Sequence, residues 1–267
     1  LRMVNRSTIE QQYQRILRDE APLTDYHFSY SQSTTEHIGS ISLEFLVNPN
    51  DRPSSNIHIL IGRNGVGKTT ILNKMVNSLL QLQAVNQIQG NFTSTNDWGL
   101  VQKLPNNYFA GLVSLAFSAF DPFEPPTEQQ NGGGDIRYHY VGIKKRLPAQ
   151  NGGWIWGVKD KSDFADEFVS SLSLCFSLKA KRERWLNAVR KLESDANFAE
   201  MNLDGLLTHY DSNAYNRERQ FEEDANHLFL GMSSGHSIVL LSITKLVETV
   251  EEKSLVFRQR SELNRTI

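Results

Sequence analysis

The 267 residues are enough for one large α/β domain or two small ones, and 39% hydrophobic residues can build a sizeable core. A formal net charge of −2 excludes a global attraction to nucleic acid or anionic membranes, so a polyanion would need a local basic patch. The longest apolar stretch, residues 109 to 117, is too short to span a bilayer and the polar start lacks a signal-peptide core, so we expect a cytoplasmic protein with no membrane partner.

The first predicted elements lead toward a glycine-rich loop. Residues 7 to 19 place apolar side chains on one face, which predicts a short amphipathic helix. Residues 37 to 47 alternate apolar and polar side chains, as a half-buried strand does. A turn-rich segment then separates this strand from a second one, "IHILI" at residues 57 to 61. We expect both strands in a mixed sheet with a parallel core.

The loop itself, "GRNGVGKT" at residues 62 to 69, satisfies the P-loop pattern G-x-x-x-x-G-K-[ST] and precedes a helix expected over 68 to 85. Average residue usage would give this string by chance in about one chain in a hundred of this length. Its glycines let backbone N–H groups approach phosphates, Lys68 neutralises charge, and the Thr69 hydroxyl ligates Mg²⁺. The alternative is a glycine-rich turn with an exposed lysine. The residues expected to bind ATP with Mg²⁺ are Gly62, Asn64, Gly65, Gly67, Lys68, Thr69 and Thr70, with Thr69 as the metal ligand.

The middle of the chain combines strands, a loop and helices. Residues 108 to 120 are continuously apolar and predict a buried strand, and "IRYHYVGI" at 136 to 143 predicts the next one. Between them, residues 122 to 135 hold three prolines and three consecutive glycines, which predict a flexible loop. Residues 163 to 195 predict a long helix and 216 to 229 a second, more polar helix. We interpret these helices as a lobe inserted into the sheet domain.

A second motif precedes a strongly apolar helical segment that ends near Val250. The residues "MSSGH", 232 to 236, follow the P-loop by about 165 residues and come before the strand-like "SLVF". This order resembles that of ABC-type P-loop ATPases, in the RecF/SMC/OLD-like branch of DNA-repair and anti-phage proteins. The resemblance makes "MSSGH" the family's signature motif and the helix after it the signature helix. The resemblance implies a homodimer in which Ser234 and Gly235 of one protomer contact the nucleotide held by the P-loop of the other. The alternative is a serine-glycine helix cap with no ligand.

The resemblance implies that residues 1–267 form a single, incomplete ABC-type ATPase domain with four parts. Its expected parts are the N-terminal strands with the P-loop, a strand and flexible-loop region, the helical lobe, and the signature helix with the following strand. These parts are residues 1–87, 88–160, 161–230 and 231–257.

The resemblance also raises expectations that single residues do not settle. An adenine-stacking aromatic would be Tyr26, Phe28, Tyr30 or His37, with core packing as the alternative. A lid-side residue near Mg²⁺ would lie at 116 to 123 or just beyond, where a plain turn is equally compatible. The polar candidates there are Ser118, Asp121, Gln129 and Gln130.

The acids needed for hydrolysis are missing from the expected place. The family follows its signature helix with a strand that ends in Asp-Glu, whereas here "SLVF" continues as "RQRSELNRTI". Glu262 lies five residues past Phe257, beyond a basic segment, and we do not accept it as the catalytic acid. Glu251 and Glu252 stand at the opposite end of the strand. The catalytic residues stay unassigned, and we expect an ABC-type domain cut off or altered at this strand.

Other clusters have two interpretations each. The basic run 179 to 191 around Trp185 could track a phosphate backbone with Trp185 as a stacking platform, or be a solvated helix face. "GIKKR" at 142 to 146 is a second basic spot with the same alternatives. Cys175 has apolar neighbours and fits a small core residue better than a reactive thiol. The histidines show no spacing that suggests a transition metal.

These observations give two functional hypotheses. The first is an ATP-binding ABC-type ATPase subunit or fragment whose dimer closure controls a partner such as a nuclease, with nucleic acid as a further candidate partner. The second is a nucleotide-binding or assembly module that does not hydrolyse ATP. A kinase or GTPase fits less well, because no N-K-x-D motif follows the P-loop.

Overall fold

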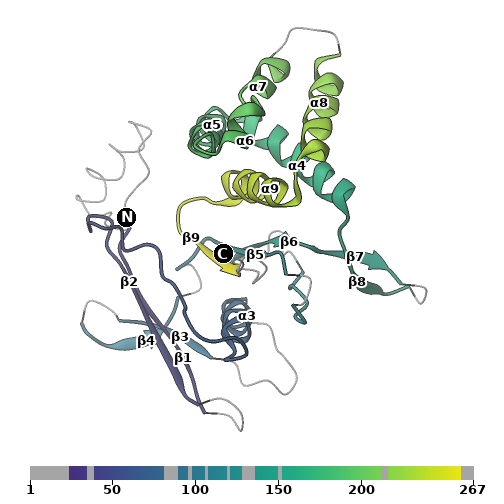
Figure 1. The fold of residues 1–267 in the computed structure, drawn as a ribbon. Coiled ribbons are helices and arrows are strands. Elements are labelled where there is room, and N and C mark those ends of the chain that lie inside the picture. The colour runs from purple at the N-terminus through teal and green to yellow at the C-terminus, as the bar shows by residue number, and fades with distance from the viewer. Residues whose placement is uncertain are drawn as a thin grey trace, which may run out of the picture. The chain divides into compact units, whose positions relative to one another are not determined.

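A computed structural model of the chain shows a mixed α/β protein that divides into two compact units (Figure 1). The first unit holds residues 1–112, 126–138 and 251–255, and the second holds 113–125, 139–250 and 256–267. The structure describes residues 24–34, 39–80, 90–95, 98–105, 108–118, 121–127, 136–149, 152–211 and 216–259. The helix predicted at 7 to 19 lies outside these ranges.

The first unit contains a four-stranded antiparallel sheet of order β2-β1-β3-β4. The strand predicted at residues 37 to 47 is confirmed as β2, in which half-buried apolar residues alternate with exposed residues. The central β1 pairs Phe28 with Phe45 of β2 and Tyr30 with Phe92 of β3, which buries an aromatic core on one face. The strands are β1 (Tyr26–Gln32), β2 (Ile41–Val47), β3 (Asn91–Thr95) and β4 (Val101–Lys103).

Helix α3 (Lys68–Leu79) follows the glycine-rich loop and packs on β3. Its apolar side chains at Met75, Val76 and Leu79 are buried, so the helix is anchored by its second half while its first turn stays accessible. The helix expected from residue 68 is thus confirmed as far as Leu79, and residues 81–89 are outside the described ranges.

The strand predicted at residues 57 to 61 is wrong in this structure. The segment has no regular secondary structure, and no strand in the described part of the chain pairs with it. Ile57, Ile59 and Ile61 are 74%, 78% and 87% exposed. A strand needs a neighbour for its N–H and C=O groups, and the β-branched pattern alone does not supply one. The sheet that β2 joins is antiparallel throughout, because β1, β2, β3 and β4 pair antiparallel, so this sheet does not supply the expected parallel core.

Three of the predicted strands form a second sheet of order β6-β5-β9. These are β5 (Gly111–Ala116), β6 (Arg137–Gly142) and β9 (Ser254–Gln259). Almost every side chain of β5 is buried, which confirms the prediction of a strand covered on both faces. Gly142 has a packing reason to be glycine, because an added Cβ would lie 2.1 Å from the carbonyl oxygen of Ala116.

The long helix predicted over 163 to 195 is two helices, α4 (Lys161–Ser177) and α5 (Lys179–Leu192). The chain breaks at Leu178, whose φ of −117° and ψ of 121° are extended. The guanidinium of Arg182 donates to the carbonyl oxygen of Phe176 at 3.1 and 2.7 Å, which satisfies an acceptor that the break leaves open. No glycine or proline marks this break, so the helical periodicity runs through it.

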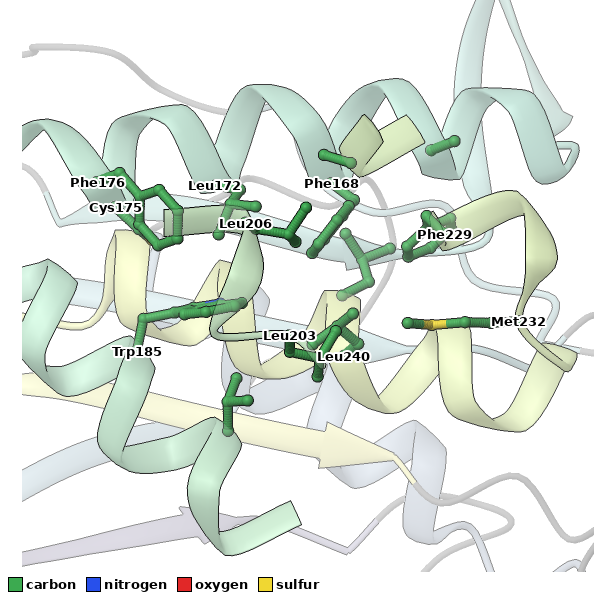
Figure 2. Close-up of a cluster of buried hydrophobic side chains, with 14 of the residues drawn as sticks. Phe168, Leu172, Cys175, Phe176, Trp185, Leu203, Leu206, Phe229, Met232 and Leu240 are labelled. Atoms are coloured by element: carbon green, nitrogen blue, oxygen red, sulfur yellow. The ribbon is translucent and has the colours of Figure 1, made fainter. Parts of the chain in front are cut away.

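The helices of the second unit enclose a large hydrophobic core (Figure 2). Helix α4 packs on α5, α8 and α9, and the cluster includes Phe168, Leu172, Phe229 and Leu240. The remaining helices are α6 (Ala196–Glu200), α7 (Gly205–Tyr210), α8 (Arg217–Gly231) and α9 (Ser234–Thr249). The helices expected at 216 to 229 and after the "MSSGH" motif are therefore confirmed.

The packing of this core decides between the alternative interpretations of Cys175 and of Trp185. Cys175 is fully buried and burial raises its pKa to about 12, which confirms a core residue rather than a reactive thiol. Trp185 is also fully buried, and its indole Nε1 donates to the Thr244 hydroxyl at 2.9 Å. Of the two interpretations of the basic run 179 to 191, the one that uses Trp185 as a stacking platform is therefore excluded, because neither ring face is open to a base.

In the described part of the chain, no helix combines the length and apolar character needed to cross a membrane.

Candidate functional site

The loop of residues 62 to 69 has the backbone geometry that its glycines permit. Gly65 and Gly67 have φ values of 80° and 90°, a left-handed conformation that L-residues rarely adopt. Gly62 has another reason, because an added Cβ would lie 2.9 Å from a methyl carbon of Val66. Three of the predicted positions are thus ones where a side chain would strain or crowd the loop.

The Lys68 side chain folds back over this loop. Its ammonium Nζ donates to the carbonyl oxygens of Gly62 at 2.9 Å and Arg63 at 2.8 Å. Two of the three ammonium protons are thereby directed at the loop backbone, and the positive charge lies above the loop. The sequence predicted Lys68 as the charge-neutralising residue, and the structure places it over the glycines that it was expected to serve.

The loop ends at the N-terminus of α3, where backbone N–H groups have no helical partners. Gly67 is the N-cap, and the N–H of Ile71 donates to the Gly67 carbonyl at 2.9 Å as the first helical bond. The N–H groups before Ile71 therefore lack acceptors inside the helix. The first turn carries no acidic residue, and Thr69 and Thr70 are half-buried in it. Asn64 is exposed in the turn before the helix. This end of α3 can receive an anion without competition from an adjacent carboxylate.

The second motif lies at the start of α9, in the second unit. Ser233 is the N-cap: its hydroxyl accepts from the His236 N–H at 3.4 Å and lies 2.7 Å from the His236 Nδ1. Ser234 and Gly235 are exposed in the first turn, and an added Cβ at Gly235 would meet no atom within 4 Å. The capping role therefore belongs to Ser233, and the two residues predicted to contact nucleotide are left accessible.

Asp121, the lid-side candidate, is engaged in a local turn. Its carboxylate accepts from the Phe123 N–H at 3.0 Å, and its own N–H donates to the Ser118 carbonyl at 3.4 Å. This is the plain turn that the sequence left open as the alternative. Gln129 and Gln130 lie outside the described residues.

The carboxylates near β9 lie before the start of the strand, which is the end opposite to the one where the family carries its acids. Glu251 and Glu252 precede the strand, and Glu251 pairs with Arg137 at 2.5 Å. The far end of β9 carries Arg258 and Gln259, and Glu262 is outside the described residues. Among the described residues, no group of three His, Cys, Asp or Glu side chains is placed to hold a metal ion.

The adenine-stacking candidates fit core packing better than ligand binding. Phe28 and Tyr30 are buried, and Phe28 stacks on Phe45 with ring centroids 4.8 Å apart. Burial raises the pKa of the Tyr30 hydroxyl. Tyr26 is half-buried and stacks on Phe109 at 6.0 Å, and His37 lies outside the described residues.

Comparison with curated proteins finds Protein ea59 of Escherichia phage lambda, which is 38% identical over 276 residues. The match covers 99% of this chain and 50% of that protein, so the chain spans about half the length of the curated relative it matches. No family model matches the chain, and no solved structure matches it significantly.

Proposed function

We propose that this chain binds ATP with Mg²⁺ at the loop of residues 62 to 69. The observation that carries the proposal is the joint placement of two left-handed glycines, Gly65 and Gly67, and the Lys68 ammonium at the start of α3. Left-handed glycines turn successive N–H groups toward one side of a loop, and the helix N-terminus adds partial positive charge there. A triphosphate offers the concentrated negative charge that this arrangement fits.

In this proposal each residue of the loop has a specific role. Lys68 exchanges its bonds to the Gly62 and Arg63 carbonyls for bonds to phosphate oxygens, which keeps its charge paired. The Thr69 hydroxyl would hold Mg²⁺, which when bound neutralises part of the phosphate charge. Asn64 lies within the loop and Thr70 lies in the first turn of α3, so both are placed beside the proposed nucleotide. Among the described residues, Arg258 and Gln259 stand where a strand-end acid pair would be needed for hydrolysis.

The proposed molecular role is therefore nucleotide binding that controls assembly, without appreciable hydrolysis by this chain alone. Resemblance to ABC-type ATPases of the RecF/SMC/OLD-like branch supports closure of a homodimer through Ser234 and Gly235. A complete ATPase that controls a nuclease is the broader candidate, with the missing acids supplied from outside this chain. The match to half of a longer phage protein is compatible with it.

Calorimetric titration of ATP with Mg²⁺ tests the proposal directly. We expect Lys68→Ala to weaken ATP binding by tenfold or more, because a charge-assisted hydrogen bond contributes about 1.5 to 3 kcal/mol. Lys74→Ala, on the same helix but past the first turn, should bind as the wild type does. Equal affinity of Lys68→Ala and the wild type would disprove the assignment.

The assembly part of the proposal has its own expected result. Gly235→Arg should abolish ATP-dependent dimerisation, because a bulky side chain there would block the contact across the two-fold interface. The fold and the ATP affinity should stay intact, because the position has open space around it. Gly39→Arg places the same side chain at another open glycine and should dimerise normally. Sedimentation with a non-hydrolysable ATP analogue compares the three proteins. Identical association of Gly235→Arg and the wild type would favour a helix cap with no ligand.

A further inference from the structure

Strands β7 (Lys144–Pro148) and β8 (Trp154–Val158) form a two-stranded antiparallel ribbon in the second unit (Figure 1). The register opposes Arg146 with Trp156 and Pro148 with Trp154. Side chains alternate between the faces of a strand, so one face of the ribbon carries two basic residues and both tryptophans. We call this the tryptophan face, and its residues are Lys144, Arg146, Pro148, Trp154, Trp156 and Val158.

The tryptophan face is positively charged and lacks neighbouring acids in sequence. Residues 136 to 159 contain five Lys or Arg residues and no Asp or Glu. Three of the five pair with carboxylates elsewhere: Arg137 with Glu251, Lys145 with Asp163, and Lys159 with Glu167. The other two, Lys144 and Arg146, have no carboxylate partner among the described residues, and both lie on the tryptophan face. The uncompensated charge of the ribbon is therefore gathered on one side.

The aromatic surface beside these charges is accessible. Trp154 is 61% exposed, and the Arg146 guanidinium lies 5.0 Å from the centre of its ring. Exposing an indole to water is unfavourable, and a cation over one part of it offsets only a fraction of that cost. The Lys144 ammonium donates to the Phe123 carbonyl, which leaves two of its three protons for another acceptor.

We propose that the tryptophan face binds single-stranded nucleic acid. Lys144 and Arg146 contact phosphates, while Trp154 and Trp156 stack on bases, which in a single strand have exposed ring faces. An acidic protein surface would satisfy the charges but not the indoles, and an apolar protein surface would leave both cations unpaired. The site differs from the basic helix α5, whose Trp185 is buried. The proposal is independent of ATP binding, because no residue of the P-loop takes part.

Fluorescence anisotropy with a labelled oligothymidylate, in the absence of nucleotide, tests this binding on the whole chain. We expect Arg146→Glu to weaken binding by tenfold or more and Trp154→Ala to weaken it by about tenfold. Arg146→Gln should also reduce the slope of log affinity against log salt by about 0.7, the value for one lost phosphate contact. The same oligonucleotide in a duplex should bind more weakly, since its bases are already stacked.

A matched control is Lys179→Glu, the same charge reversal on the basic helix α5, where the side chain is 87% exposed. It should bind the oligonucleotide as the wild type does, and so should Lys68→Ala. Circular dichroism confirms that each variant is folded. No binding by the wild type, equal binding by Arg146→Glu, or loss of binding in Lys179→Glu alone would each overturn the proposal without bearing on ATP binding.

Discussion

Steady-state phosphate release by this chain is expected to stay near background even when ATP is bound. The loop at 62 to 69 supplies positioning and part of the charge neutralisation, but hydrolysis also needs a carboxylate that orients the attacking water. Each lost contact of this kind commonly costs on the order of a hundredfold in rate. Glu251 is paired with Arg137, and Asp121 is engaged by the Phe123 N–H, so neither is free to substitute.

The matched protein for this measurement has the tail after Val256 replaced by an apolar strand that ends in Asp-Glu. The replacement keeps the first part of β9, including the Ser254 hydroxyl that accepts from the Glu251 N–H. It should hydrolyse ATP faster than the unmodified chain, and Lys68→Ala in the same background should remove the gain. Brisk hydrolysis by the unmodified chain, abolished by Lys68→Ala, would show that a catalytic carboxylate lies elsewhere in the chain and that the molecule is an active ATPase.

Local patterns predicted much of the secondary structure. The alternation in residues 41 to 47 and the continuous apolar character of 111 to 116 correspond to β2 and β5. The helices that begin at Lys68, Arg217 and Ser234 start close to where the apolar periodicity and the two motifs place them. These signals are local because a few neighbouring residues decide which faces must be buried.

Features that depend on distant partners were not predicted. Residues 57 to 61 have an ideal strand pattern, yet a strand forms only where another strand offers its backbone. Residues 26 to 32 alternate as clearly, and β1 becomes the centre of a sheet because β2 and β3 lie on either side. The apolar periodicity does not show the break at Leu178. The break depends on Arg182 of the next helix, which donates to the open carbonyl oxygen of Phe176.

The same distinction applies to the candidate sites. The P-loop positions are contiguous, so sequence alone predicted Gly65, Gly67 and Lys68 and the role of each. The tryptophan face combines residues from two strands, and only the register shows that Arg146 and Trp154 share a side. Its signal in the sequence is the alternating "WIWGV" beside "KKR", in a stretch without acids.

Phe168→Ala is expected to lower the free energy of unfolding of the helical core by about 3 to 5 kcal/mol. Phe168 is fully buried on α4, and its ring stacks on Phe229 with centroids 4.9 Å apart (Figure 2). Truncation removes the buried ring and leaves a cavity between α4 and α8. Leu174→Ala on the same helix is the control, because Leu174 is 51% exposed and its loss should cost about 0.5 kcal/mol or less.

Cys175 offers a direct readout of this difference, because it is the single cysteine of the chain and is fully buried. Its thiol, with a pKa raised to about 12 by burial, should react with an alkylating reagent only when the core opens. Phe168→Ala should increase the alkylation rate on the order of a hundredfold or more, whereas Leu174→Ala should leave it nearly unchanged. A loss of 3 to 5 kcal/mol in opening free energy corresponds to at least this factor at 1.4 kcal/mol per decade. Equal alkylation of the two variants would mean that the α4 core does not control access to Cys175, and that the packing around Phe168 is not the source of this unit's stability.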